Sequence, residues 1–297
     1  MSTIGIVSPG AMGSALGRSW MAGGARVVAT LDGRSARTMG LAGGLELLPT
    51  LVEVVRASDL VVSVCPPRAA AEVADAVGAA ALAVGRAPVF ADLNAISPAS
   101  VADIGARAAV AGMPFVDGAV SGGPPVEGGD TMLYLSGEQA PWVADLPADG
   151  LRRRVVGDRP GTASAVKMCT ASVYKGTTAI WAQALQTALH HGVLDVVLAD
   201  LAEEFPDQAS VAGRRIASAT SKSARFVGEM EEIARTQGAA GASPELFEGM
   251  AAVYTRLATT PLAALTPEEA RDVHDLGEVL ARLSDAGRGS PRRAGAP

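Results

Sequence analysis

A long run of helix-forming residues, 161–191, constrains the fold of this chain more than any other stretch. Its composition predicts one unbroken helix of roughly 30 residues, about 45 Å at 1.5 Å per residue. Gly192 is expected to end this helix. Such a helix is longer than one small domain needs, and the chain has 297 residues. We therefore expect two domains.

Lysine is rare in this chain, which makes its few positions informative. Only three of the 25 lysine and arginine residues are lysine, namely Lys167, Lys175 and Lys222. Arginine can replace lysine where only a positive charge is needed, but not where an amine must lose its proton. Lys167, near the start of the predicted helix, is therefore a candidate proton carrier. The alternative is a lysine whose stem simply extends from the helix end into solvent.

Strand-like and helix-like segments alternate before the long helix. Runs rich in β-branched residues occur at 3–8, 25–31, 59–65 and 88–93, and further strand residues lie within 115–137 and 151–156. Helix-like composition follows the first, third and fourth of these runs. This alternation predicts βαβ units and an α/β fold.

A glycine-rich turn joins the first predicted strand to its helix. It consists of Gly10, Ala11, Met12 and Gly13. Small residues there let the backbone approach a pyrophosphate held at a helix N-terminus, so we interpret them as cofactor contacts. The usual glycine two positions before Gly10 is Ser8. A tight turn without a ligand is the alternative.

Three residues after the second strand bear on which nicotinamide cofactor is used. Asp32 could accept a hydrogen bond from the ribose 2′-hydroxyl of NAD, whereas Arg34 and Ser35 could hold the 2′-phosphate of NADP. We favour NADP over NAD. Because ligands gather at the carboxyl ends of parallel strands, further candidate contacts are Cys65, Pro66 and Asn94.

A second glycine turn, Ser121-Gly122-Gly123, follows a strand-like run. Its hydroxyl and closely spaced main-chain N–H groups suit an anion such as a carboxylate. A plain glycine loop is the alternative.

Composition excludes several classes of partner. The net charge is −6 without a basic block in the folded part, which argues against nucleic acid. No apolar run reaches 18 residues, so we expect no membrane span. Cys65 and Cys169 are expected in apolar surroundings, which predicts no disulfide and fits the cytoplasm. We expect neither a signal peptide nor a metal site.

Three blocks in this order resemble the β-hydroxyacid dehydrogenase superfamily, which includes 3-hydroxyisobutyrate and 6-phosphogluconate dehydrogenases and has imine reductases as relatives. They are IGIVSPGAMG, DGAVSGGPPVEGGDTMLYLSG and GTASAVKM. The second resembles the substrate-binding D-x-x-V-S-G-G turn, and the third places Lys167 on the catalytic lysine. Downstream, KSARFVGEMEEIA resembles a branch whose C-terminal domain is 6-phosphogluconate dehydrogenase-like.

The resemblance implies a Rossmann-type NAD(P)-binding domain over residues 1–160 and an all-α domain over 161–284 for substrate binding and homodimer formation. We expect residues 285–297 to be disordered. The implied reaction is hydride transfer between nicotinamide and a small hydroxy or oxo acid of the 3-hydroxy type. Lys167 would be the general acid and base, and the Ser121, Gly122 and Gly123 turn would hold the substrate.

The chain departs from the superfamily pattern at two places. Ala171 stands where asparagine is common, so Tyr174 or Lys175 would take over this substrate contact. Arg225 and Phe226 stand where a Lys-Asp pair is common. Lys175 and Arg225 together would suit a second anionic group, but ion pairs with neighbouring glutamates explain them equally well. Imine reduction, and non-catalytic binding or sensing of NADP, stay open as alternatives, and so does a decarboxylating reaction.

Overall fold

The computed structural model of the protein describes residues 1–284. These residues divide into two compact units, of which unit 1 is Met1–Cys169 and unit 2 begins at Thr170. The division falls inside helix α7 (Thr162–His190), whereas the domain boundary expected at residue 160 lies just before this helix. The expected disordered tail, 285–297, lies outside the described residues.

Residues 1–169, all of them described, form an eight-stranded sheet of order β3-β2-β1-β4-β5-β6-β7-β8. The strands are β1 (Thr3–Ile6), β2 (Arg26–Ala29), β3 (Glu46–Leu47), β4 (Leu60–Ser63), β5 (Val89–Asp92), β6 (Phe115–Ser121), β7 (Thr131–Ser136) and β8 (Leu151–Gly157). All neighbouring strands are parallel except β6 and β7, which form an antiparallel hairpin. Parallel strands joined by helices confirm the α/β prediction.

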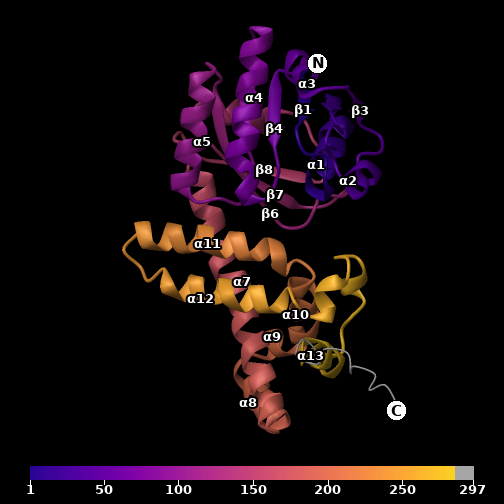
Figure 1. Ribbon diagram of the computed structural model, residues 1–297, viewed down its shortest axis with the longest axis vertical. Helices are drawn as coiled ribbons and strands as arrows, with labels where there is room; N and C mark the ends of the chain where they lie inside the picture. Colours follow the sequence, from indigo (N-terminus) through magenta and orange to yellow (C-terminus); the bar gives the residue numbers. More distant parts are fainter. Residues whose placement is uncertain (285–297) are drawn as a thin grey trace, which may run out of the picture. The chain divides into compact units, whose positions relative to one another are not determined.

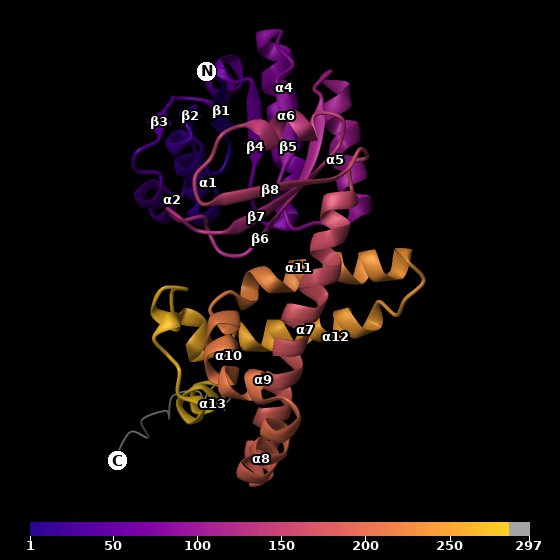
Figure 2. The same ribbon diagram turned by 180° about the vertical axis from the view of Figure 1, so that it is seen from behind.

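Helices cover both faces of this sheet. They are α1 (Ala11–Ala22), α2 (Ala36–Leu41), α3 (Leu51–Ala57), the short 3-10 helix η1 (Pro67–Ala69), α4 (Ala70–Val84), α5 (Pro98–Val110) and α6 (Ala140–Asp145). One core cluster joins the sheet to α1 and α6 through side chains such as Trp20 and Val143, and the other joins it to α3, α4 and α5 through Val55, Val77 and Ile104. Figures 1 and 2 show α4 and α5 on one side of the strands and α6 on the other.

The six predicted strand regions all contain strands. Four features of unit 1 were not predicted: the edge strand β3, helix α3, the antiparallel direction of the β6–β7 hairpin, and α6 between β7 and β8. Two residues are enough for β3 because Val28 and Ala29 of β2 hold it as a neighbour. A strand this short gives no periodic signal in the sequence.

Unit 2 is helical in the part that the structure describes. Besides the rest of α7 it contains α8 (Leu194–Glu204), α9 (Pro206–Ser210), α10 (Ala212–Thr220), α11 (Ser223–Ala239), α12 (Glu245–Leu257), the 3-10 helices η2 (Pro261–Ala264) and η3 (Glu269–Arg271), and α13 (Leu276–Ser284). Helices α11 and α12 lie side by side in both views (Figures 1 and 2). Phe226 and Tyr254 meet edge to face between them at 5.3 Å, and the Tyr254 hydroxyl donates to the Lys175 carbonyl of α7 at 2.8 Å.

The long helix predicted over 161–191 is confirmed as α7, and Gly192 follows it with a φ of +70°. The prediction of apolar surroundings is wrong for Cys169, which is exposed. Cys65 is half-buried. Within the described residues, Cys169 is on an exposed face of α7. In the described part of the chain, no helix combines the length and the hydropathy that a membrane crossing requires.

Candidate functional site

The glycine turn between β1 and α1 is shaped to accept a ligand. A Cβ at Gly13 would lie 2.2 Å from the Ser8 carbonyl oxygen, so only glycine fits there. A Cβ at Gly10 would meet nothing within 4 Å, and the space beside this residue is therefore open. No side chain caps the first turn of α1 and no acidic residue lies in it. Its main-chain N–H groups can therefore bind phosphate oxygens, as a dinucleotide requires.

Two buried polar atoms, one in this turn and one in the Arg34 side chain, support the same interpretation. Within the described residues, Arg34 Nε and Ser8 Oγ have no hydrogen-bond partner. The Arg34 charge also lies near enough to Cys65 to act on its thiol. Buried donors usually have partners, so these two atoms fit a site that a polar ligand completes.

The two other residues predicted to select the cofactor have different surroundings. Asp32 is exposed at the end of β2. Ser35 caps α2, because its hydroxyl oxygen accepts a hydrogen bond from the Thr38 main-chain N–H. The Ser35 hydroxyl therefore already has a structural task in α2.

Asn94, predicted as a cofactor contact, uses its side chain inside unit 1. Its Oδ1 accepts a hydrogen bond from the Cys65 main-chain N–H at 2.6 Å, and its Nδ2 donates to Ser63 Oγ and to Asp92. Asn94 therefore holds the carboxyl ends of β4 and β5 together and fixes the backbone at Cys65. Pro66, the next residue, is exposed.

Two ionisable groups at these strand ends have shifted pKa values. Burial raises the pKa of the Cys65 thiol to about 11, so the thiol stays protonated at neutral pH. Burial also raises the pKa of Asp92 to about 7, and the Asp117 charge adds to this shift. The Asn94 hydrogen bonds oppose it. Cys65 is thus a structural residue and not a nucleophile.

The Ser121-Gly122-Gly123 turn follows β6 directly. Gly122 has a φ of +112°, which favours glycine, and a Cβ at Gly123 would again meet nothing within 4 Å. Thr131 Oγ1 donates to the Gly123 carbonyl at 3.0 Å and holds the turn against β7. Ser121 is half-buried. The turn thus presents open backbone beside a hydroxyl, which is suited to an anion.

Asp117, in the middle of β6, binds the start of α7. Its fully buried carboxylate accepts hydrogen bonds from the main-chain N–H groups of Gly161 at 2.8 Å and Ser164 at 3.0 Å, and from the hydroxyls of Ser136 and Ser164. Ser136 Oγ in turn accepts from the Ala163 N–H at 3.0 Å. These bonds satisfy N–H groups that a helix start leaves unpaired, and they place a negative charge there. The sequence motif contained Asp117, but its capping role was not predicted.

Lys167 lies in the second turn of the helix that Asp117 anchors, and it is half-buried. The strand that ends in the Ser121 turn therefore also fixes the first turn of the lysine-bearing helix. Both predicted catalytic features of unit 1 depend on β6.

The predicted substrate residues of unit 2 have different surroundings from one another. Tyr174 is 70% exposed. Lys175 and Arg225 both form ion pairs with the buried Glu229, the second at 3.1 Å, and Lys175 Nζ also lies 4.3 Å from the centre of the Phe226 ring. Glu229 therefore brings these two cations together.

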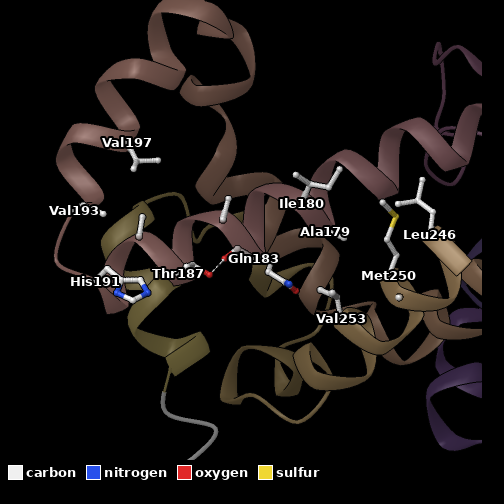
Figure 3. Close-up of a pocket in the computed structure, with 13 residues that line it drawn as sticks. Ala179, Ile180, Gln183, Thr187, His191, Val193, Val197, Leu246, Met250 and Val253 are labelled. Carbon is white, nitrogen blue, oxygen red and sulfur yellow. Dashed lines mark hydrogen bonds between the residues drawn. The ribbon is translucent and has the colours of Figure 1, made fainter.

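Unit 2 also contains an apolar groove, roughly 690 Å³ in volume, along α7, α8 and α12. Figure 3 shows the side chains that line it, among them Ile180, Val197, Leu246, Met250 and Val253. His191 is its one lining side chain that can carry a charge, within the described residues. The groove therefore suits an apolar surface and not an acid substrate.

Comparisons with known proteins agree with this arrangement. Residues 3–145 match the NAD binding domain of 6-phosphogluconate dehydrogenase, and residues 188–257 match a domain of unknown function, DUF1932. No curated protein matches the chain significantly.

Three solved structures illustrate the likeness. The conserved protein MTH1747, of unknown function but described as similar to 3-hydroxyacid dehydrogenases, shares 26% identity over 86% of this chain and 96% of its own, with a TM-score of 0.65. Mycobacterium tuberculosis 3-hydroxyisobutyrate dehydrogenase shares 21% identity over 91% of this chain and 98% of its own, with a TM-score of 0.67. Streptomyces aurantiacus imine reductase shares 20% identity over 90% of this chain and 98% of its own, with a TM-score of 0.54. The last two show the fold alone.

The matched cofactor domain, the open glycine turn and the helical domain that follows α7 are thus found together in one chain. This protein belongs to the β-hydroxyacid dehydrogenase superfamily, as an NAD(P)-binding oxidoreductase of the branch whose C-terminal domain is DUF1932.

Proposed function

We propose that the protein transfers a hydride between a nicotinamide cofactor and a small hydroxy or oxo acid of the 3-hydroxy type. The observation that carries this proposal is the Asp117 network. It links the strand that ends in the anion-binding Ser121 turn to the helix that carries Lys167. One buried carboxylate therefore holds in place the elements that bear both proposed functional groups.

In this proposal Lys167 carries the proton. It takes the proton from the hydroxyl during oxidation and returns one to the carbonyl oxygen during reduction. The Ser121 hydroxyl and the main-chain N–H groups of Gly122 and Gly123 hold the carboxylate, so that the reacting carbon is oriented. The nicotinamide, when bound, supplies or accepts the hydride.

The cofactor is held by the first turn of α1, with Gly10 leaving room for the pyrophosphate. We infer that NADP is preferred over NAD. Arg34 supports this inference, because its buried Nε is without a partner in the described residues and a guanidinium binds a phosphate through two hydrogen bonds. Asp32 would support NAD instead.

Three substrate contacts are proposed in unit 2, namely Tyr174, Lys175 and Arg225. Tyr174 offers an exposed phenol. Lys175 and Arg225 share one carboxylate, that of Glu229. The two cations and this carboxylate together therefore keep a net positive charge. This charge supports the idea that the substrate carries a second anionic group.

Imine reduction is the second candidate, since imine reductases have the same fold. The two reactions differ in what the enzyme must protonate, and so in their need for an amine at position 167. A panel of 3-hydroxy acids, 3-oxo acids and cyclic imines separates them.

The test is a fluorescence titration with NADPH and NADH, followed by turnover on this panel with three proteins: wild type, Lys167→Ala and Lys167→Arg. We expect NADPH to bind all three alike and more tightly than NADH. The wild type should turn over an acid, and both variants should lose about 100-fold or more, because arginine keeps the charge but does not release a proton. Equal turnover by wild type and both variants would contradict the proposed role of Lys167.

We also propose a homodimer formed through unit 2. Its support is the apolar groove and the exposed side chains of Ile180 and Leu246 within it, each 57% exposed. Exposed apolar surface of this extent is typical of a protein interface.

A further inference from the structure

A second cavity in unit 2 differs sharply from the apolar groove. It measures roughly 660 Å³, and all the residues that line it belong to unit 2. Five of them are cationic: Lys175, Arg214, Arg215, Lys222 and Arg271. None of its lining residues in the described part of the chain is an aspartate or glutamate. We call it the cationic cavity.

The charge of the surrounding unit makes this grouping informative. Residues 170–284 contain nine lysines and arginines against fifteen aspartates and glutamates, yet five of the nine line one cavity. Two of the three lysines of the whole chain are among them. Positive charges that merely increase solubility would be spread among the acidic residues.

Within the described residues, four of these cations are outside every ion pair with a carboxylate. They are Arg214, Arg215, Lys222 and Arg271. Like charges held together without a counter-ion repel one another, which is unfavourable for folding. A bound anion would relieve this repulsion.

Lys222 shows this repulsion between positive charges most clearly. It is half-buried at the start of α11, and its Nζ donates to Ser218 Oγ at 2.9 Å. Burial lowers the pKa of Lys222, and the positive charges of Arg225 and Arg271 lower it further. The charges that act on this amine are thus cations.

The chemistry of the lining selects a phosphate group. Guanidinium groups bind phosphate oxygens with paired hydrogen bonds, and an ammonium group adds a compact charge. The hydroxyls of Thr177 and Ser218 lie on the same lining and can donate to further oxygens, whereas the Thr178 hydroxyl already donates to the Tyr174 carbonyl at 3.0 Å. A concave site of this size fits a small molecule, and the net charge of −6 disfavours nucleic acid.

We propose that the cationic cavity binds the phosphate group of a small molecule, with Arg214, Arg215, Lys222 and Arg271 as its ligands. Phosphate binding here does not require the proposed hydride transfer to be correct, although Tyr174 and Lys175 of the lining are also proposed substrate contacts. The phosphate can come from two sources, a phosphorylated substrate of the same enzyme or a separate phosphorylated ligand.

The test is calorimetric titration of the full-length protein with inorganic phosphate, at an ionic strength kept constant with chloride. We expect saturable binding to wild type, weakened about tenfold or more in Lys222→Met and in Arg214→Gln/Arg215→Gln. Arg282→Gln is the control. It removes the same charge from α13, where Arg282 pairs with Glu278 outside the cavity, and should bind phosphate like wild type.

Two further readouts keep the result interpretable. NADPH titration of every variant should be unchanged, which separates failure of this site from failure of the cofactor site. Hydrogen exchange of wild type should slow in α10 and the start of α11 when phosphate replaces chloride, and this needs no variant to fold. The proposal is overturned if phosphate does not bind wild type in the millimolar range, or if the cavity variants bind as tightly as the control.

Turnover then distinguishes the two sources of phosphate. Inhibition by inorganic phosphate that is competitive with the acid substrate would mean that the cavity holds a phosphate of the substrate. Binding without competition would mean a separate phosphorylated ligand. Each of these results supports the proposed chemistry of the site.

Discussion

At the scale of single residues, two glycines in the same turn carry different constraints. A Cβ at Gly13 would collide with the backbone at Ser8, whereas a Cβ at Gly10 would enter open space. Packing therefore requires glycine at position 13 but not at position 10. Only a ligand that approaches the backbone would require glycine at position 10.

This difference predicts opposite effects of two alanine substitutions. Gly10→Ala should change the free energy of unfolding by less than about 0.5 kcal/mol and still weaken NADPH binding strongly, because its methyl group would occupy the space for the pyrophosphate. Gly13→Ala should destabilise unit 1 as well. Urea unfolding and NADPH titration of the two variants check this. Unimpaired NADPH binding by Gly10→Ala would show that the turn does not hold the cofactor.

Asp92 makes the stability of the protein depend on pH. Its pKa is about 7 in the folded protein, against 3.8 as its ordinary value. Between these two values the folded state holds a proton that the unfolded state has lost. The free energy of unfolding therefore falls as pH rises through this window, by up to about 1.4 kcal/mol per pH unit, and levels off above pH 7.

Asp92→Asn should remove this contribution. Urea unfolding at several pH values from about pH 5 to about pH 8 measures it, with Asp103→Asn on the exposed face of α5 as the control. The free energy of unfolding of Asp92→Asn should rise relative to wild type as pH increases, and that of the control should not. Parallel pH curves for wild type and Asp92→Asn would contradict the account.

At the scale of elements, the junction between β6 and α7 is the most informative feature of unit 1. Asp117→Asn should destabilise the protein by roughly 3 kcal/mol, because it removes a buried charge that several donors require and turns an amide group toward them. Its turnover should fall further than the loss of folded protein explains, since the start of α7 would no longer be fixed. Asp117→Asn that unfolds like wild type in urea would argue against the capping role.

The sequence could predict most elements but not this junction. The strands, the glycine turn and α7 follow from local patterns of β-branched, glycine and helix-forming residues. Asp117 and Ser164 lie 47 positions apart, and Asn94 lies 29 positions from Cys65. Nothing in a local pattern couples such pairs. The sequence therefore indicated that Asn94 and Asp117 belong to the site, while their internal hydrogen bonds appear only in the fold.

In unit 2 the same limit applies to charged residues. The sequence left open whether Lys175 and Arg225 bind an anion or pair with glutamates, and the structure pairs both with Glu229. The cationic cavity draws residues from α7, α9, α10, α11 and η3. No stretch of sequence contains this grouping, so it was not predicted.

At the scale of the whole molecule, the apolar groove predicts self-association. If unit 2 forms a homodimer, Ile180→Glu/Leu246→Glu should convert it to a monomer, because charges would then be buried in the interface. Val110→Glu is the matched control, since Val110 is an apolar residue of α5 in unit 1 and is 81% exposed. Light scattering coupled to size exclusion measures the mass. A monomeric wild type would contradict the homodimer, and so would a dimeric double variant.

The most direct measurement of the central claim follows the hydride itself. The protein is incubated with NADP⁺ and a 3-hydroxy acid that carries deuterium on its hydroxyl-bearing carbon, and the cofactor is analysed by mass spectrometry. The account predicts deuterated NADPH from wild type, and almost none from Lys167→Ala that still binds NADP⁺. Unlabelled cofactor from wild type across the whole panel of acids, or equal labelling by Lys167→Ala, would contradict it.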